Sequence, residues 1–427
     1  DLTEKWRLCQ TSSRMMRERS NWLTRQLAST KISLKEGAIE IENTSRDMML
    51  SEARSLKEQL SNVNMEQSTI NEEINYLAMA MPNLSSDETP RDGLPREVGY
   101  INEHLARDYS SSGRCWRSHI DIGLELNLID LASAAITSGW GWYYLLNEAV
   151  QLEQALVQFA LSIAKKRGWS LVSPPSMVYS HISDLCGYQP RDHHGEKQVY
   201  QIQQKTSEVG QKPQLALAGT SEIPLASMKA NHIFEANHLP LKYFGVSRCY
   251  RAEAGGRGTN TKGLYRVHEF TKVEMFAWTL PDSKASGAIF DEMCSIQEEI
   301  LGALQLHCRI LEMPSVDLGA SAARKRDIEA SFPSRQARSS GWGEVTSVSS
   351  CTDYQTRRLA TRLRPQKQSH SSELLFPYTL NGTALAVPRV LAAILENGWV
   401  EEKSEVMIPK ALQPWMDGAQ VIGRSRK

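Results

Sequence analysis

The sequence lacks long apolar runs, paired cysteines and an excess of either charge. None of its apolar runs reaches the ~18 residues of a membrane-spanning helix, so we expect no transmembrane segment. The seven cysteines are scattered without a CxxC pair, which argues against a disulfide scaffold or a cysteine zinc site and favours a reducing compartment. The chain begins at Asp1, so we expect a processed or trimmed start, with no signal or transit segment in what remains.

Charge is balanced over the whole chain. The 49 basic and 49 acidic side chains give a formal net charge of zero, which argues against coating nucleic acid through a global basic field. Local segregation of charge stays possible. The 427 residues, with 41% apolar and 23% charged, suffice for a real core and for two or three domains, and they exclude a disordered chain.

The first 81 residues carry two heptad patterns. Apolar or small residues recur in steps of four and three over 2–30 and over 49–81, with Gln67 as a polar interruption. Residues 1–34 hold seven basic and three acidic side chains (+4), whereas 35–81 hold four and nine (−5). This predicts an antiparallel coiled-coil hairpin at 1–81, a protruding arm roughly 45 Å long. A solvated surface helix pair without a partner is the alternative.

The rest of the chain predicts one large α+β domain. Pro82 ends the second helix, and we expect a linker at 82–118 and a catalytic domain at 119–427. Short β-like runs alternate there with amphipathic helices. The expected strands are 215–218, 242–249, 266–278 and 374–380, and the expected helices are 145–166, 285–306 and 386–396.

A glycine-rich, cationic stretch joins two of these strands. Arg251 and Glu253 lie two residues apart, so on a strand they share a face, where one can grip a phosphate and the other an amino-bearing base. In the next strand Phe270 and Glu274 share a face about 13 Å apart. An aromatic platform and a carboxylate at that spacing suit an elongated ligand with a base at one end and an amine at the other. An ordinary charged hairpin is the alternative, and His268 on the same face is more simply structural.

Three further segments offer polar groups. Thr220-Ser221-Glu222 follows an apolar strand and offers a hydroxyl and a carboxylate to a small zwitterion. Glu344-Val345-Thr346-Ser347 offers oxygen ligands suited to Mg²⁺, although a polar loop is the simpler alternative. Arg389 falls in the first turn of a helix opened by Pro388, which makes an anion site. Because no P-loop or GxGxxG sequence occurs, a phosphate site here must use arginines and metal.

Taken together, these segments resemble the zinc-independent seryl-tRNA synthetases over nearly the whole chain. The resemblance is carried by six ordered segments: MPNLSSDETP after the arm, SGWGWYYLLNEAVQLEQAL near class II motif 1, LAGTSEIPL, CYRAEAG and TKGLYRVHEFTKVE in motif 2, DIEASFPS and GEVTSVSSCTDYQTRR before motif 3, and TLNGTALAVPRVLAAILENG in motif 3.

The resemblance implies a class II antiparallel β-sheet flanked by helices, working as a homodimer through motif 1. It implies ligation of L-serine to tRNA(Ser) through a seryl-adenylate, with ATP and Mg²⁺, and an arm that reaches the long variable arm of the tRNA. The residues implied for serine are Thr220, Ser221, Glu222, Glu274, Asn381 and Thr383; for ATP, Arg251, Ala252, Glu253, Arg266, Phe270, Glu344, Val345, Thr346, Ser347 and Arg389; for the metal, Glu344 and Ser347. Arg251, Glu274 and Arg389 would be catalytic, and we expect Arg14, Arg17, Arg19 and Arg25 to contact tRNA.

Two details qualify this expectation. Ser350 stands where the family usually has Asn, which could loosen the serine pocket. The segments TALAVPR and FTKVEMF resemble those of mitochondrial members, so we expect the mitochondrial matrix, with the cytoplasm as alternative.

A catalytically inactive paralog that acts as a binding or regulatory subunit is the main rival function. A ligase that charges a carrier protein is a second rival, against which the arm argues.

Overall fold

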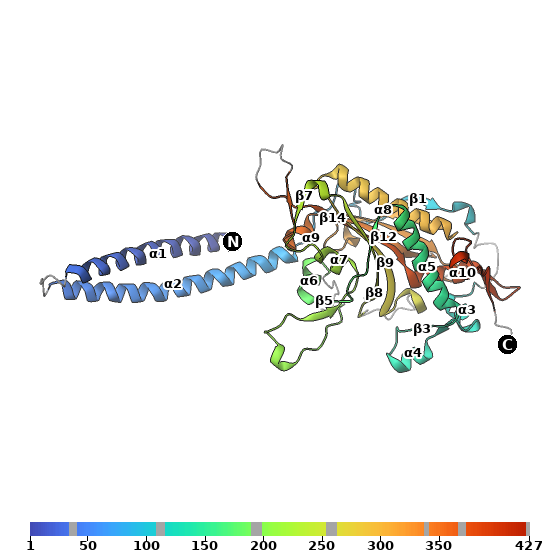
Figure 1. The fold of residues 1–427 in the computed structure, drawn as a ribbon, viewed down its shortest axis with the longest axis horizontal. Coiled ribbons are helices and arrows are strands. Elements are labelled where there is room, and N and C mark those ends of the chain that lie inside the picture. The colour runs from blue at the N-terminus through green and yellow to red at the C-terminus, as the bar shows by residue number, and fades with distance from the viewer. Residues whose placement is uncertain are drawn as a thin grey trace. The chain divides into compact units, whose positions relative to one another are not determined.

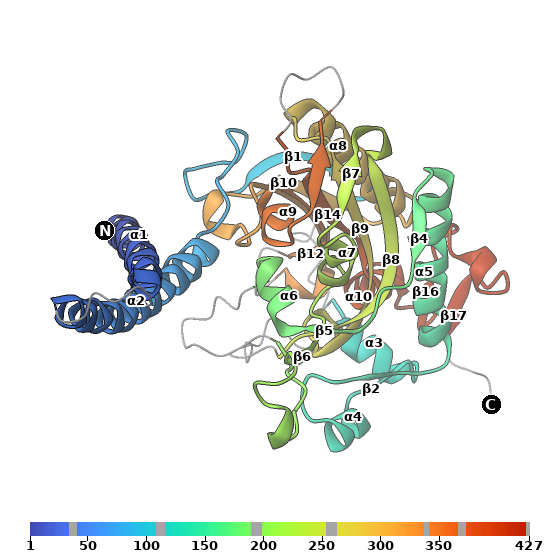
Figure 2. The ribbon, with the colours of Figure 1, turned by 60° about the vertical axis from the view of Figure 1, so that its left-hand side comes forward.

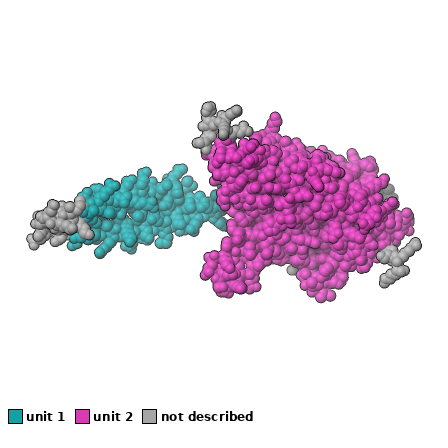
Figure 3. Space-filling model, viewed as in Figure 1, with its two compact units in different colours: residues 1–81 teal, residues 82–427 magenta. Residues whose placement is uncertain are grey.

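The computed structural model describes residues 1–33, 41–107, 116–188, 199–252, 263–336, 341–365 and 373–423, and the side chains of residues 29–45 are not described. The chain divides into two compact units, residues 1–81 and residues 82–427, coloured separately in Figure 3.

The first unit is the expected helical hairpin. Helix α1 (Leu2–Ser33) and helix α2 (Ile41–Ala80) pack against each other along their length (Figure 1). The second helix begins earlier than the heptad pattern at Met49 indicated. Its first turns lack a regular apolar seam, so periodicity alone could not find them.

The heptad positions form the seam between these helices. Leu23 and Ile70 are fully or almost fully buried, and most of the other predicted seam positions are half-buried. Gln67 is half-buried within the seam. The last predicted positions, Leu77 and Met81, are exposed instead. The small, polar Ser13 is buried in the seam, where its Oγ donates to Asn64 Oδ1 at 3.1 Å.

An eight-stranded sheet organises the second unit. Its order is β1-β10-β11-β12-β14-β9-β8-β4, and only the edge pair β4–β8 is parallel. The strands are β1 (Arg96–Ile101), β4 (Ser170–Val172), β8 (Leu241–Tyr250), β9 (Glu269–Thr279), β10 (Cys308–Glu312), β11 (Arg324–Ser331), β12 (Trp342–Thr352) and β14 (Tyr378–Ala386).

Three long helices cover one face of this sheet, as Figure 2 shows. They are α5 (Glu148–Lys166), α8 (Ser283–Ala303) and α10 (Val387–Gly398). Alternate residues of the central strands, such as Val273 and Met275, are fully buried against them. Because strand side chains alternate between faces, residues 270, 272 and 274 point to the opposite face. That face carries the candidate site.

Shorter elements complete the second unit. The remaining helices are α3 (His119–Glu125), α4 (Ala132–Thr137), α6 (Ser180–Leu185), α7 (Glu222–Ser227) and α9 (Tyr354–Arg358). The remaining strands are β2 (Ile129–Asp130), β3 (Tyr144–Leu145), β5 (Met177–Tyr179), β6 (Leu215–Leu217), β7 (Ile233–Glu235), β13 (Arg362–Arg364), β15 (Trp399–Val400), β16 (Glu405–Met407) and β17 (Val421–Gly423).

Three boundaries differ from the sequence prediction. The segment 82–118 is not only a linker, because β1 within it pairs with β10 at the edge of the large sheet. The strand expected from Arg266 begins at Glu269, since Gly263–Tyr265 forms a 3-10 turn first. The strand expected at 374–380 is shifted to Tyr378–Ala386, so Gly382 lies within a strand and not in a turn.

Candidate active site

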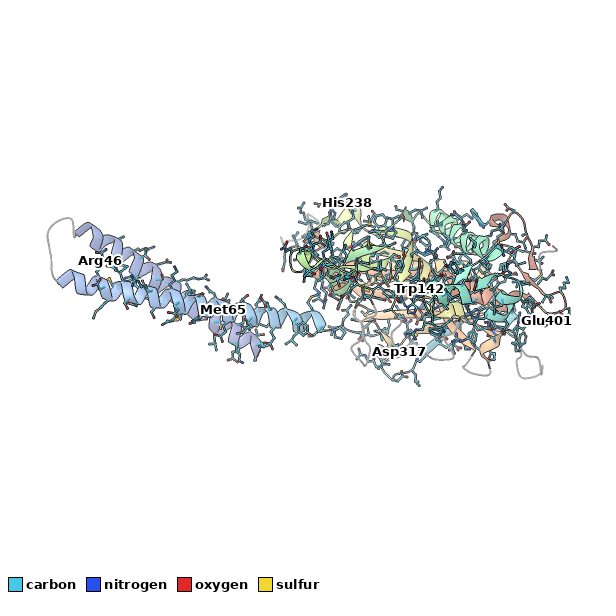
Figure 4. All side chains as sticks on the ribbon, turned by 90° about the horizontal axis from the view of Figure 1, so that it is seen from below. Arg46, Met65, Trp142, His238, Asp317 and Glu401 are labelled. Atoms are coloured by element: carbon cyan, nitrogen blue, oxygen red, sulfur yellow. The ribbon has the colours of Figure 1, made fainter. Side chains whose placement is uncertain are left out.

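A cavity of about 340 Å³ opens over the middle of the large sheet. Its walls come from β9, β12 and β14, from the start of α7 and α10, and from the segments around Arg251, Tyr265 and Asp317. Of these residues, Asp317 is labelled in Figure 4. Predicted site residues that line it are Thr220, Glu222, Arg251, Arg266, Phe270, Glu274, Glu344, Val345, Thr346, Ser347, Asn381, Thr383 and Arg389.

Antiparallel pairing explains how residues distant in sequence meet at one end of this cavity. Glu274 of β9 lies directly opposite Thr383 of β14 and, on its other side, opposite Gly245 of β8. Glu274, Thr383 and Thr220 are all buried. Thr220 Oγ1 donates to Glu274 Oε2 at 3.3 Å. This end of the cavity therefore presents hydroxyls and carboxylates to a small polar ligand.

A buried lysine neutralises part of this end. Lys272, two residues before Glu274 on the same strand face, forms an ion pair with Glu274 Oε2 and donates to Thr220 Oγ1 at 2.6 Å. Its side chain is 7% exposed. Burial disfavours the charged lysine, but the Glu274 carboxylate outweighs this effect and raises the pKa of Lys272.

Glu222 is the second carboxylate at this end. Burial and the neighbouring Glu274 carboxylate raise the pKa of Glu222 to about 7. Gln355, fully buried, donates from Nε2 to Glu222 Oε1 at 2.6 Å and to the Cys186 carbonyl at 3.3 Å. Because a carbonyl can only accept, the contact with Cys186 fixes which end of the Gln355 amide faces Glu222. Thr379 Oγ1 donates to the other end at 2.8 Å.

The middle of the cavity holds an arginine over an aromatic ring. The guanidinium carbon of Arg251 lies 5.3 Å from the centroid of the Phe270 ring, and Arg251 Nε donates to the Gly219 carbonyl at 3.3 Å. The backbone N–H of Arg251 donates to the His268 carbonyl. These contacts hold a cation over a flat apolar surface, and both groups line the cavity.

The opposite end gathers cations around one carboxylate. Arg389, near the N-terminus of α10, donates from Nη1 to Glu344 Oε2 at 3.3 Å and from Nε to the Tyr265 carbonyl at 3.0 Å. Burial opposes ionisation of Glu344, but Lys325 and Arg389 outweigh it and hold its pKa below the usual range. Burial and Glu344 instead raise the pKa of Asp327, although Lys325 Nζ lies 2.7 Å from Asp327 Oδ2.

One buried amide joins the two ends. Gln297, on α8, donates from Nε2 to the carbonyl of Ser347 at 2.8 Å and to the carbonyl of Thr383 at 2.7 Å. The Thr346 hydroxyl also bonds to the Thr383 carbonyl. Strands β12 and β14 are thus tied together from the core, immediately beside the cavity.

The donor set at Glu344 fits a magnesium ion. Glu344 is an ionised carboxylate open to the cavity, and Ser347 adds a hydroxyl on the same strand. Asp327, which pairs with Ser347 across β11 and β12, has an Oδ1 without a hydrogen-bond partner among the described residues. The described part of the chain contains no cluster of three metal-ligating His, Cys, Asp or Glu residues. Mg²⁺ commonly takes only one or two carboxylates and completes its shell with water and phosphate.

Several predicted site residues lie elsewhere. Ser221 is fully buried and does not line the cavity, and its Oγ has no partner among the described residues. Ala252 does not line it either, and Glu253 falls outside the described residues. Ser350 pairs with Leu380 and Arg324 across the sheet and is not a cavity residue, so we find no direct effect of it on the pocket.

His268 leaves the face on which periodicity placed it. Its Nδ1 contacts the Tyr200 hydroxyl at 2.8 Å and the Arg251 carbonyl at 3.0 Å, and its ring stacks on Trp142 at 5.7 Å (Trp142 is labelled in Figure 4). The strand begins one residue after His268, so the period of two does not apply to it. The contacts support the structural interpretation.

The sequence analysis missed three polar residues of the site. Lys272 shares a strand face with Phe270 and Glu274 but was given no role, while Lys325 and Gln355 were not considered. Lys272 could have been found from its spacing to Glu274. No sequence signal marked Gln355, because its role depends on packing between α9 and α7.

The four arginines expected to contact tRNA lie on α1 of the first unit and are exposed. Arg19 makes two hydrogen bonds to Glu52 of α2, at 2.7 and 3.0 Å, and its guanidinium lies 4.4 Å from the Trp22 ring. Arg17 Nη2 donates to Asn64 at 3.3 Å. Arg14 and Arg25 complete the set.

Comparison with known proteins agrees with this geometry. The model of the tRNA synthetase class II core domain (G, H, P, S and T) matches residues 204–398. The mitochondrial serine--tRNA ligase of Saccharomyces cerevisiae is 40% identical over 371 residues, covering 86% of this chain and 78% of that protein. The chain belongs to the seryl-tRNA synthetase family.

Two further relatives of this family match over longer spans. The serine--tRNA ligase of Rhodopirellula baltica is 37% identical and covers 95% of this chain and 88% of its own length. The crystal structure of seryl-tRNA synthetase from Pyrococcus horikoshii complexed with ATP superimposes with a TM-score of 0.82 at 30% identity, covering 100% of this chain and 92% of that one. The seryl-tRNA synthetase fold expected from the sequence, a large antiparallel sheet with an N-terminal hairpin, is confirmed.

No helix in the described ranges is both long enough and apolar enough to span a membrane.

Proposed function

We propose that this seryl-tRNA synthetase family member activates L-serine with ATP in the cavity and transfers the seryl group to tRNA(Ser). The convergence of Glu222, Glu274 and Thr383 at one end, Arg251 over Phe270 in the middle, and Arg389 beside Glu344 at the other carries the proposal. The inactive-paralog alternative finds no support, because every described residue assigned to serine or phosphate, Ser221 and Ala252 apart, faces the cavity.

In this proposal the cavity holds serine and a bent ATP end to end. The serine ammonium and hydroxyl lie at Glu222, Glu274 and Thr383, and Arg251 lies between the serine carboxylate and the α-phosphate. The carboxylate oxygen attacks the α-phosphorus, forming a new P–O bond as the bond to pyrophosphate breaks. No general base is needed, since the carboxylate is already ionised.

Positioning of the substrates and stabilisation of the phosphate charge then supply most of the acceleration of this step. Phe270 would stack on adenine, and Arg266 and Arg389 would hold the outer phosphates. Glu344 and Ser347 would hold Mg²⁺, which supplies positive charge to the phosphates when bound. The Glu344 carboxylate would then contact both the metal and Arg389, whose Nη1 donates to Glu344 Oε2 in this structure.

We assign the hairpin of residues 1–81 to tRNA binding through Arg14, Arg17, Arg19 and Arg25, because its first helix concentrates positive charge. We also propose a homodimer through motif 1, the segment 138–156, together with the residues just before it. Ile136 is 88% exposed and Trp140 is 59% exposed there, which leaves an apolar surface that a second copy could cover.

We propose the mitochondrial matrix as the location. Support comes from the 40% identity to the yeast mitochondrial ligase.

Serine-dependent ATP–pyrophosphate exchange tests the enzymatic proposal. We expect exchange that needs Mg²⁺, followed by charging of tRNA(Ser). Arg251→Ala should reduce exchange by ~100-fold or more, the scale seen when a transition-state donor is removed. Absence of exchange in well-folded protein would contradict the proposal, and full activity of Arg251→Ala would contradict the role of that arginine.

A further inference from the structure

The cavity contains a cation that the proposed reaction does not use. Lys272 is buried at the amino-acid end and contacts two of the groups assigned to serine. A buried lysine is costly unless it is paired, and here it is paired with Glu274. Its position therefore affects what remains available to a ligand.

The hydroxyl of Thr220 is fully used in this arrangement. Its oxygen accepts from Lys272 Nζ at 2.6 Å and from the backbone N–H of Glu222 at 3.3 Å, and its hydrogen goes to Glu274 Oε2 at 3.3 Å. A hydroxyl has one hydrogen and two lone pairs. With Lys272 in place, the Thr220 hydroxyl has no capacity left for a substrate ammonium.

The carboxylate of Glu274 is used on one side only. The contacts from Lys272 and Thr220 both go to Oε2, and none to Oε1 is found among the described residues. Glu222 is in turn held at its Oε1 by Gln355. Glu222 also accepts a side-chain hydrogen bond from Asn381. Glu274 Oε1 is therefore the acceptor left for the ligand, and Glu222 adds negative charge beside it.

Charge supports the same arrangement. Lys272 faces Glu274 on its own strand, Glu222 on α7, and Cys249 and Arg251 at the end of β8. Without Lys272, the two buried carboxylates would lose the cation that is paired with Glu274 and acts on Glu222, and like charges at such a site favour uptake of a proton. A protonated carboxyl group there would be a poor partner for an ammonium.

We propose that Lys272 is a positioning residue for the amino acid: it stays on Glu274 Oε2 and Thr220, supplies positive charge beside the two carboxylates, and leaves Glu274 Oε1 and Glu222 to bind the α-ammonium group. The inference rests on the proposed function, because it concerns how that same pocket holds serine. It also moves Thr220 from direct contact with the ammonium to a supporting role.

Steady-state pyrophosphate exchange with Lys272→Met tests this inference, with the KM for serine and the KM for ATP measured between pH 6 and 9. We expect the serine KM to rise about 10-fold or more, as for a lost hydrogen bond to a charged group, with the ATP KM changed less than about 2-fold. The pH at which the serine KM falls should move upward, because loss of Lys272 removes a charge that lowers the pKa of Glu222.

Lys242→Met is the matched control, because Lys242 is also a partly buried lysine paired with a glutamate, Glu292 at 2.9 Å, but outside the cavity. It should leave the serine KM and its pH dependence unchanged. If Lys272→Met folds poorly, Lys272→Gln keeps a donor without the charge and should show the same shift in pH dependence. ATP alone should still raise the Tm of either variant as it does for the wild type.

Three results separate the possibilities. A lower serine KM in Lys272→Met would show that the lysine competes with the substrate ammonium, which overturns the inference. An unchanged serine KM and pH dependence would overturn it as well and leave Lys272 a structural residue. Absence of serine-dependent exchange in the wild-type protein would instead contradict the proposed function.

Discussion

At the scale of single residues, the candidate site depends on two buried carboxylates with different partners. Glu274 pairs with Lys272, whereas Glu222 has only neutral donors in direct hydrogen-bond contact, such as Gln355. A glutamate whose pKa is raised in the folded state binds more protons folded than unfolded. Glu222, at about 7 against 4.5, therefore costs stability that grows as pH rises from 4.5 to 7, by up to about 3 kcal/mol.

Glu222→Gln should consequently stabilise the empty protein at high pH while impairing its function. We expect the Tm difference between variant and wild type to grow from pH 5 to pH 8, because only the wild type must ionise this group. The serine KM at pH 8 should rise by ~10-fold or more, since a hydrogen bond to a charge is lost.

Thermal unfolding at several pH values checks this prediction. Glu299→Gln is the control, because Glu299 lies in a partly exposed pair with Arg167. A Tm difference for Glu222→Gln that stays constant from pH 5 to 8 would show that Glu222 keeps an ordinary pKa.

At the scale of elements, the sequence predicted strands and helices well where periodicity was uninterrupted. The hairpin and the strand through Glu274 were found because their apolar spacing is regular. The last strand was misplaced because Asn381-Gly382 is a common turn signal, which pairing with two neighbouring strands overrides. The contacts of Gln297 and Gln355 could not be predicted, since they join elements far apart in sequence.

Gly382 gives a direct test of that misplaced strand. A Cβ at this position would lie 3.1 Å from Val348 Cγ2, 3.2 Å from Met275 Cε and 3.3 Å from the Ser347 carbonyl. We expect Gly382→Ala to lower the free energy of unfolding by about 1–3 kcal/mol through overpacking. Because Ser347 and Thr383 are its neighbours, exchange activity should fall as well.

Gly287→Ala is the matched control for chemical denaturation. Gly287 lies within α8, where an added Cβ meets no atom within 4 Å. It should be neutral or stabilise the protein by up to about 1 kcal/mol, as expected for glycine within a helix. Equal stability of Gly382→Ala and wild type would mean that β14 is packed less tightly than described.

At the scale of the whole molecule, zero net charge conceals an uneven distribution. The first helix of the hairpin carries the positive excess and the second the negative one. Arg19 is bound to Glu52, so part of the positive excess serves the hairpin itself. Binding of a polyanion should then depend mainly on the other three arginines.

Replacing Arg14, Arg17 and Arg25 together by Gln should weaken tRNA binding and reduce the slope of log K against log salt by up to about 3, or about 1 for each lost phosphate contact. Arg19→Gln should change the slope less, because its charge is already paired. Filter binding across a salt series measures this, and exchange without tRNA should be unaffected. An unchanged slope, as expected for the control Lys57→Gln on α2, would place the tRNA contacts elsewhere.

The exposed apolar surface near α4 makes a second prediction at this scale. Ile136→Asp should shift the protein from dimer to monomer in sedimentation velocity, since a charge would be buried at the proposed interface. Val316→Asp, at a residue 66% exposed on another part of the unit, should leave the dimer intact. A dimer that persists in Ile136→Asp would exclude this surface as the interface.

The amide of Gln297 has a consequence for protein engineering. It holds the backbone of Thr383, beside the amino acid, and that of Ser347, beside the phosphates, through one buried nitrogen. A redesign of this pocket for a larger amino acid must enlarge the space near Thr383, and any backbone shift there is transmitted to Ser347. Variants changed at Thr383 alone should therefore use ATP poorly, and variants that activate the larger amino acid should carry compensating changes on α8.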